Sequence, residues 1–276
     1  MRSKDQKIFN LISHTVMILV TVMAVLPFVL VFLSSVTEEN TLVLNGYSFF
    51  PEKFSLYAYE YIVMKGKKIF RAYAVTLFVT VVGTSINVMI SAMLAYPLSL
   101  KDLPGKRIFT FYVVFTLLFN GGLVPTYLMY TSAFNVKNTI FALIVPNLLM
   151  HTMNVLLMRT YYSTSIPTEL FEASEIDGAG KVQQLIYITF PMIRQTIIIV
   201  MLLVITGCFK IFEIVYQLTG GGPNHMSDLL VTYMYYSTFT SSRYGYGMSI
   251  ASVTFLISAL FAVIYLYVTR EQVGEE

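Results

Sequence analysis

The sequence predicts an all-α integral membrane protein with six membrane-spanning helices in one transmembrane domain, residues 1–276. Two features of the composition support this class: 56% of the residues are hydrophobic and only 12% are charged, and the mean hydropathy is +0.70. Soluble domains carry about 25% charged residues. A helix across a bilayer needs about 20 apolar residues. Four stretches without a charged residue are long enough, namely 8–37, 72–100, 108–136 and 138–158.

The first predicted span, residues 9–35, follows three basic residues, a pattern that a secretory signal peptide also shows. Its apolar run is too long for such a peptide, and Ser34-Ser35-Val36 lacks a convincing cleavage site. We therefore interpret it as a retained helix. The run FFPEKFSLYAYEYIV that follows has the aromatic spacing of a short helix near the membrane surface.

The second and third predicted spans, residues 72–99 and 108–130, are joined by the polar turn KDLPGKR. Gly121, Gly122 and Pro125 predict a kink or a close helix approach within the third span. The remaining predicted spans are 139–159, 196–218 and 245–269.

A polar loop, residues 166–191, separates the fourth and fifth spans. Pro167 marks the start of a short helix, and Glu172 lies where the positive end of the helix dipole favours an acid. Asp177-Gly178 ends this helix, and a second one is predicted over residues 181–189, before the next proline. Two short helices that meet at a glycine bend form a compact knob, which suits insertion into a cleft on another protein.

The run EASEIDGAGKVQQLIYITFP within this loop resembles the EAA loop of ABC importer permeases. The residues at the expected spacing are Glu172, Ala173, Asp177, Gly178, Ala179, Ile188 and Pro191. Two positions depart from the pattern. Ser174 stands where the family most often has alanine, and Gln195 stands where a second proline often follows, so the exit into the fifth span is expected to bend less sharply.

The resemblance implies the type I importer permease fold with a cytoplasmic coupling helix that docks into the ATPase subunit. It assigns this coupling to Glu172, Ala173, Ser174, Asp177, Gly178, Ala179, Leu185, Ile188 and Pro191. It also implies that both termini are cytoplasmic. The charges agree only weakly with this orientation, since ten of the 18 basic residues would then lie inside.

The segments RTYYSTSIPTELFEAS and LTGGGPN resemble the carbohydrate-uptake branch of these permeases, which is maltose-transporter-like and imports oligosaccharides or polysaccharide fragments. This implies a multi-pass sugar permease of the cell membrane that is not itself an enzyme. The implied partners are a second homologous permease in a heterodimer, an ATPase dimer that binds ATP and Mg, and an extracytoplasmic solute-binding protein. No cofactor or metal is expected in this chain.

The fifth span contains Thr206, Lys210, Glu213 and Gln217 at offsets of four, three and four, which is one face of a helix. Aromatic rings beside hydrogen-bonding groups suit a sugar, whose C–H faces stack on rings. The candidate translocation path is therefore Phe209, Lys210, Phe212, Glu213, Tyr216 and Gln217. The alternatives are an intramembrane ion pair between Lys210 and Glu213 that fixes packing against the partner permease, and a pair near enough to the outer surface to be wetted.

Two further faces are polar: Thr80, Thr84, Asn87 and Ser91 in the second span, and Asn147, His151 and Asn154 in the fourth. Because small polar residues commonly join helices within bundles, we expect hydrogen bonds between helices here rather than substrate ligands.

Other classes fit the sequence less well. The single cysteine, Cys208, excludes an internal disulfide, and the net charge of +3 gives no support to nucleic-acid binding. An intramembrane enzyme would need a catalytic arrangement that the spans lack, and GGGP is no phosphate-binding loop. A secondary transporter that couples ions through Lys210 and Glu213, with His151, remains the alternative function.

Overall fold

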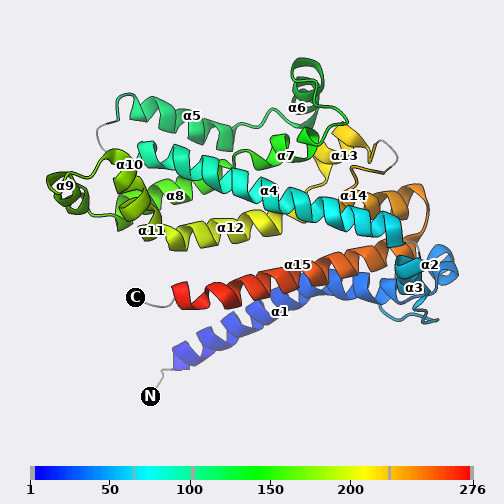
Figure 1. The fold of residues 1–276 in the computed structure, drawn as a ribbon. Coiled ribbons are helices and arrows are strands. Elements are labelled where there is room, and N and C mark those ends of the chain that lie inside the picture. The colour runs from blue at the N-terminus through cyan, green and yellow to red at the C-terminus, as the bar shows by residue number, and fades with distance from the viewer. Residues whose placement is uncertain (1–3, 65, 101–102, 223–224, 274–276) are drawn as a thin grey trace. The chain divides into compact units, whose positions relative to one another are not determined.

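The computed structural model describes residues 4–64, 66–100, 103–222 and 225–273, and these residues form helices joined by turns (Figure 1). The chain divides into two compact units. Unit 1 comprises Met1–Ile69 and Tyr233–Leu256, and unit 2 comprises Phe70–Thr232 and Ile257–Glu276.

Unit 1 is built on α1 (Lys4–Ser35) and the first half of α15 (Tyr244–Val273). The rings of Phe28 and Phe255 join these two helices, with centroids 4.9 Å apart. The short elements of the unit are α2 (Glu39–Asn45), α3 (Tyr57–Met64), the end of α14 (Leu230–Tyr235) and the π-helix η3 (Tyr236–Thr240).

Glycines allow α15 to approach its neighbours in unit 1. The Gly245 N–H donates to Glu39 Oε2 (3.0 Å), and a Cβ at this glycine would lie 2.9 Å from the same oxygen. The hydroxyls of Tyr233 and Tyr246 are 3.3 Å apart beside this contact. A larger residue at this position would therefore push α15 away from α2.

Unit 2 begins with α4 (Gly66–Ser99) from Phe70 onward. Its helices are α5 (Lys106–Leu118), α6 (Leu123–Leu128), η1 (Met129–Ala133), α7 (Phe141–Leu148), α8 (Thr152–Ser165), α9 (Thr168–Ile176), α10 (Lys181–Gln184), η2 (Leu185–Thr189), α11 (Phe190–Met192), α12 (Arg194–Cys208) and α13 (Glu213–Thr219). Helix α8 contacts both α5 and α12, and α13 contacts α6 and α7 (Figure 1). The core lies between them and includes Val79, Leu143, Met158 and Val200.

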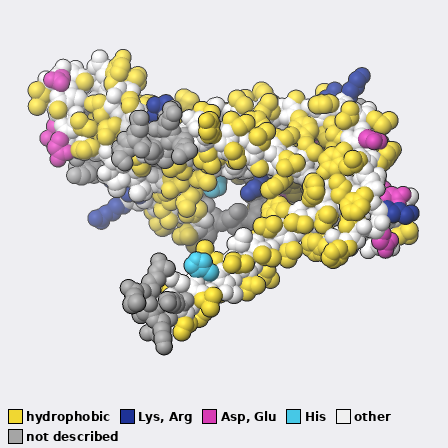
Figure 2. Space-filling view, turned by 90° about the horizontal axis from the view of Figure 1, so that it is seen from below, with side chains coloured by type: hydrophobic (Ala, Val, Ile, Leu, Met, Phe, Trp, Pro, Cys, Tyr) yellow, Lys and Arg dark blue, Asp and Glu magenta, His cyan; other side chains and the backbone are white. Residues whose placement is uncertain are grey.

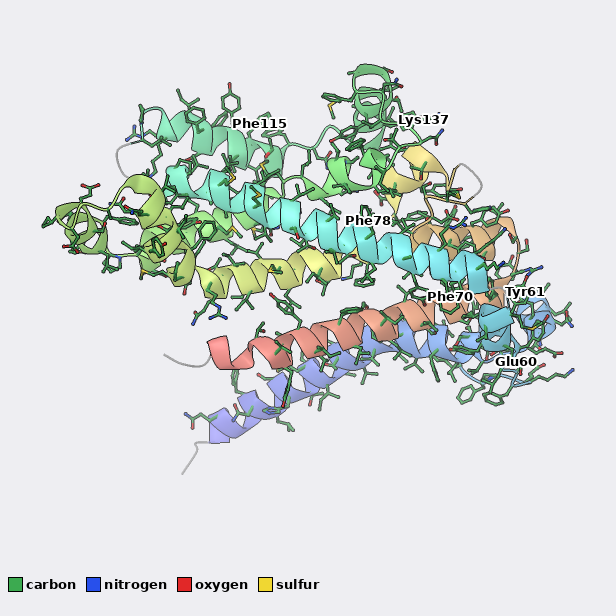
Figure 3. The ribbon with its side chains drawn as sticks, in the orientation of Figure 1. Glu60, Tyr61, Phe70, Phe78, Phe115 and Lys137 are labelled. Atoms are coloured by element: carbon green, nitrogen blue, oxygen red, sulfur yellow. The ribbon has the colours of Figure 1, made fainter. Side chains whose placement is uncertain are left out.

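Hydrophobic side chains cover much of the visible surface (Figure 2), as expected where lipid replaces water. Phe70 and Phe78 of α4 are examples of exposed rings (Figure 3). By length and composition, three helices among the described residues suit a membrane crossing: Ile8–Ser35, Gly66–Ser99 and Tyr244–Thr269. Three bent pairs raise this number to as many as six: Lys106–Leu118 with Leu123–Ala133 (113°), Phe141–Leu148 with Thr152–Ser165 (50°), and Val182–Met192 with Arg194–Cys208 (69°). The boundaries of the six spans stay predictions.

The predicted kink in the third span is present, because the chain leaves helical geometry between α5 and α6 and Gly122 adopts φ +84°. The helix expected over residues 181–189 begins where predicted. It does not end before Pro191, however, but passes through the π-helix η2 and continues through α11 to Met192. A π-turn re-pairs backbone groups locally, which lets helical turns persist next to a proline.

Gly83 of α4 lies against Leu148 of α7, and a Cβ at this glycine would be only 2.3 Å from Leu148 Cδ1. We expect Gly83→Ala to lower the unfolding temperature in detergent, because overpacking costs about 1–3 kcal/mol and outweighs the helix propensity that alanine gains. Gly207→Ala is the matched control, since no atom lies within 4 Å of its Cβ position. Equal unfolding temperatures for the two variants would contradict this packing.

Candidate functional site

A cavity of about 840 Å³ lies inside unit 2 and is the candidate site. Its lining combines apolar side chains such as Leu123, Leu157 and Leu203 with a set of polar ones. The polar side chains are Asn87, Asn120, Thr126, Asn147, His151, Asn154, Lys210 and Glu213. A mostly apolar cavity with a few converging polar groups is the usual form of a small-molecule site.

Three helix interruptions meet at this cavity. Asn120 and Gly122 lie in the break between α5 and α6, His151 lies in the break between α7 and α8, and Lys210 lies in the break between α12 and α13. Irregular backbone at membrane depth is tolerated only where protein buries it or water reaches it. The cavity provides a place at membrane depth where water can reach the backbone of these breaks.

The local chemistry of the first two breaks follows the sequence. The Asn120 side-chain oxygen accepts from the Gly122 N–H (2.9 Å), and this glycine adopts the positive φ that other residues avoid. The break before α8 is smaller: His151 has an extended conformation and its carbonyl accepts from Asn154 N–H (3.0 Å) at the start of the helix.

The third break corrects the prediction of one continuous polar face in the fifth span. Helix α12 ends at Cys208 and α13 begins at Glu213. Residues 209–212 are therefore not helical, and the fifth span is not one continuous helix. The side chains of Lys210 and Glu213 are both exposed to the cavity, and no ion pair joins them among the residues that the structure describes. The expected neutralisation at i,i+3 fails because it requires unbroken helical geometry.

The six residues predicted for the translocation path separate into two groups. Lys210, Phe212 and Glu213 line the cavity. Phe209 is buried, with its ring 6.0 Å from that of Phe261, and Tyr216 stacks on Phe212 with centroids 5.3 Å apart. Gln217 is exposed but is not part of the lining.

The polar faces of the second and fourth spans also separate. Asn154 Nδ2 donates to Asn87 Oδ1 (2.9 Å) between two buried side chains, which confirms the expected hydrogen bond between helices for this pair alone. Asn147 and His151 line the same cavity as Asn87 and Asn154, but their side chains are exposed. Sequence reasoning assigned them to packing because it could not see that α7 ends before His151.

The predicted knob is the second part of the candidate site. Helix α9 ends at Ile176, Gly178 adopts φ +80°, and α10 starts at Lys181, so the two short helices meet at a glycine bend as expected. The predicted coupling residues follow in order along it, with Glu172, Ala173 and Ser174 on α9, Asp177, Gly178 and Ala179 in the bend, Leu185 and Ile188 in η2 and Pro191 in α11. Ile176 is 87% exposed at its tip.

A buried hydrogen bond braces the knob across its bend. Gln184 is 1% exposed, and its Nε2 donates to Ser174 Oγ (2.9 Å). The Ser174 hydroxyl in turn donates to the Phe171 carbonyl (2.8 Å). The serine that departs from the family pattern therefore joins α9 to α10, a role that its position in the sequence did not reveal.

The exit from the knob into α12 bends by 69°, with Ile193 between the two helices. Gln195 lies just beyond this bend, where its side-chain oxygen accepts from the Tyr161 hydroxyl (3.1 Å). The sequence predicted that this bend is less sharp than in family members with a proline at this position. That comparison stays a prediction.

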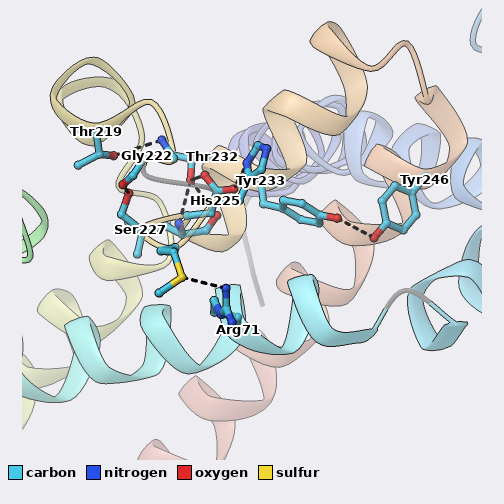
Figure 4. Close-up of polar contacts among 12 residues, drawn as sticks. Arg71, Thr219, Gly222, His225, Ser227, Thr232, Tyr233 and Tyr246 are labelled. Carbon is cyan, nitrogen blue, oxygen red and sulfur yellow. Dashed lines mark hydrogen bonds and ion pairs between the residues drawn. The ribbon is translucent and has the colours of Figure 1, made fainter. Parts of the chain in front are cut away.

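The glycine turn after α13, in which Figure 4 labels Gly222, His225 and Ser227, also contains a buried acid that the sequence pattern did not reveal. Asp228 is almost fully buried and pairs with His225 Nδ1 (2.8 Å), while Ser227 Oγ donates to the Gly222 carbonyl (2.6 Å). A Cβ at Gly221 would lie 2.3 Å from Asp228 Oδ1, which explains a glycine there. Pro223 and Asn224 of the resembling segment lie outside the described residues.

Comparison with known proteins gives a match over nearly the whole chain. The family model described as "Binding-protein-dependent transport system inner membrane component" matches residues 6–272. Among curated relatives, the polygalacturonan/rhamnogalacturonan transport system permease protein YtcP of Bacillus subtilis is 32% identical over 186 residues. That alignment covers 67% of this chain and 64% of the relative.

Two solved structures share the fold. A bacterial ABC transporter involved in the import of the acidic polysaccharide alginate has a chain that superposes with a TM-score of 0.76, at 22% identity and with 99% of both chains covered. A bacterial alginate ABC transporter in complex with an alginate pentasaccharide-bound periplasmic protein gives a TM-score of 0.67 at 16% identity, with 98% of both chains covered.

Proposed function

The chain belongs to the family of binding-protein-dependent transport system inner membrane components, and on this premise we propose that it is a permease subunit of an ATP-driven importer of oligosaccharides. The observation that carries the proposal is the convergence of three helix breaks on one cavity. Broken helices that present polar groups to a shared cavity are the usual construction of a transport path.

The cavity chemistry supports a sugar as the substrate. Its asparagine amides can donate to and accept from hydroxyls, and Phe212 offers an aromatic ring next to the charged Lys210 and Glu213. The relative YtcP is named for the transport of polygalacturonan and rhamnogalacturonan. We therefore propose that the substrate is an oligosaccharide fragment of a polysaccharide, which the cavity contacts directly.

The knob at α9 and α10 is the proposed contact with the ATPase. Its exposed apolar tip and its fixed bend suit a docking element that moves as a rigid piece. The proposed assembly contains a second permease, an ATPase dimer that holds ATP and Mg, and an extracytoplasmic solute-binding protein, with both termini of this chain in the cytoplasm. In this assembly the ATPase subunits, not this chain, hydrolyse ATP.

A pair of alanine variants tests this contact. Gly178→Ala introduces a Cβ at φ +80°, which costs about 1–2 kcal/mol in the left-handed region although no atom lies within 4 Å. Gly180→Ala adds the same methyl two residues away without positive φ, and its nearest neighbour, Gln183 Oε1, is 3.8 Å away. We expect tagged Gly178→Ala, purified from native membranes, to retain less ATPase subunit and ATP-hydrolysis activity than Gly180→Ala.

Two outcomes would overturn the proposal. The first is purification of the unmodified chain from native membranes without any ATPase subunit. The second is sugar uptake by ATP-depleted vesicles under an ion gradient, which would favour a secondary transporter that uses Lys210 and Glu213.

A further inference from the structure

We propose that the loop between α2 and α3 in unit 1 is a membrane-interface anchor, in which Phe50 and Phe54 insert at the boundary between lipid headgroups and acyl chains and fix the depth of α1. The inference does not depend on the transported substrate. Helix α1 sets the reference for depth, because its apolar side chains are exposed as far as Phe32 and the chain belongs to a family of membrane components.

A short backbone clip holds the anchor loop against the end of α1. Thr37 and Phe54 form an antiparallel bridge. Two hydrogen bonds flank it, from Glu38 N–H to the Lys53 carbonyl (3.0 Å) and from Ser55 N–H to the Val36 carbonyl (2.8 Å). At a rise of 1.5 Å per helical residue, Ser35 at the end of α1 lies about 4.5 Å beyond Phe32, and Thr37 follows two residues later. Phe54 is therefore held near the level at which the lipid-facing surface of α1 ends.

A second contact fixes α3 to the same place. Ser35, the last residue of α1, is fully buried, and its Oγ lies 2.7 Å from the Tyr59 hydroxyl. Glu60 and Tyr61 follow on α3 (Figure 3), and Tyr61 also bonds Arg243. The backbone clip and the Ser35–Tyr59 contact hold the α3 end of the loop, and Asn45 Nδ2 at the end of α2 donates to Glu52 Oε2 (3.0 Å) across the segment that contains Phe50. The fold therefore restricts the height of both rings.

The side chains that this geometry presents are apolar and unusually exposed. Phe50 is 87% exposed and Phe54 is 71% exposed, and Leu44, Leu56 and Tyr57 are exposed beside them. A cluster of this kind next to a membrane helix is typical of segments that lie in the interface, where aromatic rings are enriched.

The charges around the loop favour insertion by the rings over attraction to anionic lipid. The three exposed lysines Lys53, Lys67 and Lys68 are offset by three acids, Glu38, Glu52 and Glu60, and Lys53 Nζ lies 3.7 Å from Glu38 Oε2. A polybasic contact would need an excess of cations. The anchor is therefore expected to insert equally into neutral and anionic bilayers.

Tryptophan scanning tests the anchor directly, because the chain contains no tryptophan. The full-length variants Phe50→Trp and Phe54→Trp, reconstituted into phosphatidylcholine vesicles, are each measured with brominated lipids and with iodide. We expect bromine near the headgroup end of the acyl chain to quench both tryptophans about twofold or more relative to bromine at the chain end. Ile176→Trp on the knob is the aqueous control, and Leu19→Trp within α1 is the deep control.

Three results would overturn the anchor. Iodide quenching of both variants as strong as that of Ile176→Trp, without quenching by lipid, would place the loop in water. Protection of the two tryptophans from iodide that appears only after a solute-binding protein is added would show that the loop is a protein-docking surface. Lipid quenching confined to vesicles that contain phosphatidylglycerol would show that charge, not the rings, drives the contact.

Discussion

Replacing Lys210 with methionine is expected to reduce sugar uptake about 10- to 100-fold while the complex still assembles. Lys210 is exposed to the cavity, and no described acid neutralises it, so its ammonium group is available to substrate oxygens. A hydrogen bond from a charged donor contributes about 1.5–3 kcal/mol, and each 1.4 kcal/mol corresponds to about a tenfold change in affinity. Methionine keeps an unbranched side chain that is one heavy atom shorter, and it removes the ammonium group with its charge and its three donors.

The measurement combines uptake of labelled oligosaccharide with the yield of assembled complex from the same membranes. Lys67→Met is the matched control, because this lysine is also exposed but lies outside the cavity lining. Glu213→Gln, which keeps the shape of the other cavity charge, separates a need for both charges from a need for the cation alone. Loss of assembly in Lys210→Met would instead assign the lysine to packing against the partner permease.

The Gln184→Ala variant is expected to lower transport per ATP hydrolysed by about tenfold. The substitution removes the Nε2 donor that bridges to Ser174 Oγ and leaves a void at a site that is 1% exposed. A lost buried hydrogen bond costs about 1–3 kcal/mol, which corresponds to about a tenfold or larger shift in the population of the braced bend. ATP hydrolysis then continues while the knob transmits less of the movement.

Gln183→Ala is the control for this effect, because Gln183 is the exposed neighbour and water can replace its hydrogen bond to the Gly180 N–H. A double-mutant cycle of Gln184→Ala with Ser174→Ala isolates the bridge, and a coupling energy of about 1 kcal/mol is expected for residues in direct contact. Additive effects of the two substitutions would show that the brace does not act through this hydrogen bond.

The knob shows how far local sequence information reaches. Asp177-Gly178 predicts the end of α9, and the structure places Gly178 at φ +80°. This prediction succeeds because the residues that decide the bend are adjacent in the chain, and only glycine adopts that conformation without strain. The Ser174 to Gln184 brace did not follow from the sequence, since it depends on the angle at which two helices meet.

The fifth span shows the opposite case. No glycine or proline lies among Phe209 to Phe212, and the polar residues on both sides keep helical spacing, so a continuous helix was the natural prediction. The chain nevertheless breaks there, at a cavity that α4, α6, α7 and α8 also line. Helix propensity contributes little free energy per residue, so the packing of neighbouring helices around the cavity can override it.

The sequence by itself determined that this is a helical membrane protein, where its apolar segments lie and which loop forms the knob. These properties follow from hydropathy and from residues that are neighbours in the chain. Only the tertiary structure decided that Asn87 bonds Asn154, that Asn147 and His151 reach the same cavity as Lys210, and that Phe54 is held at the end of α1. Each of these contacts joins segments that no local pattern places together.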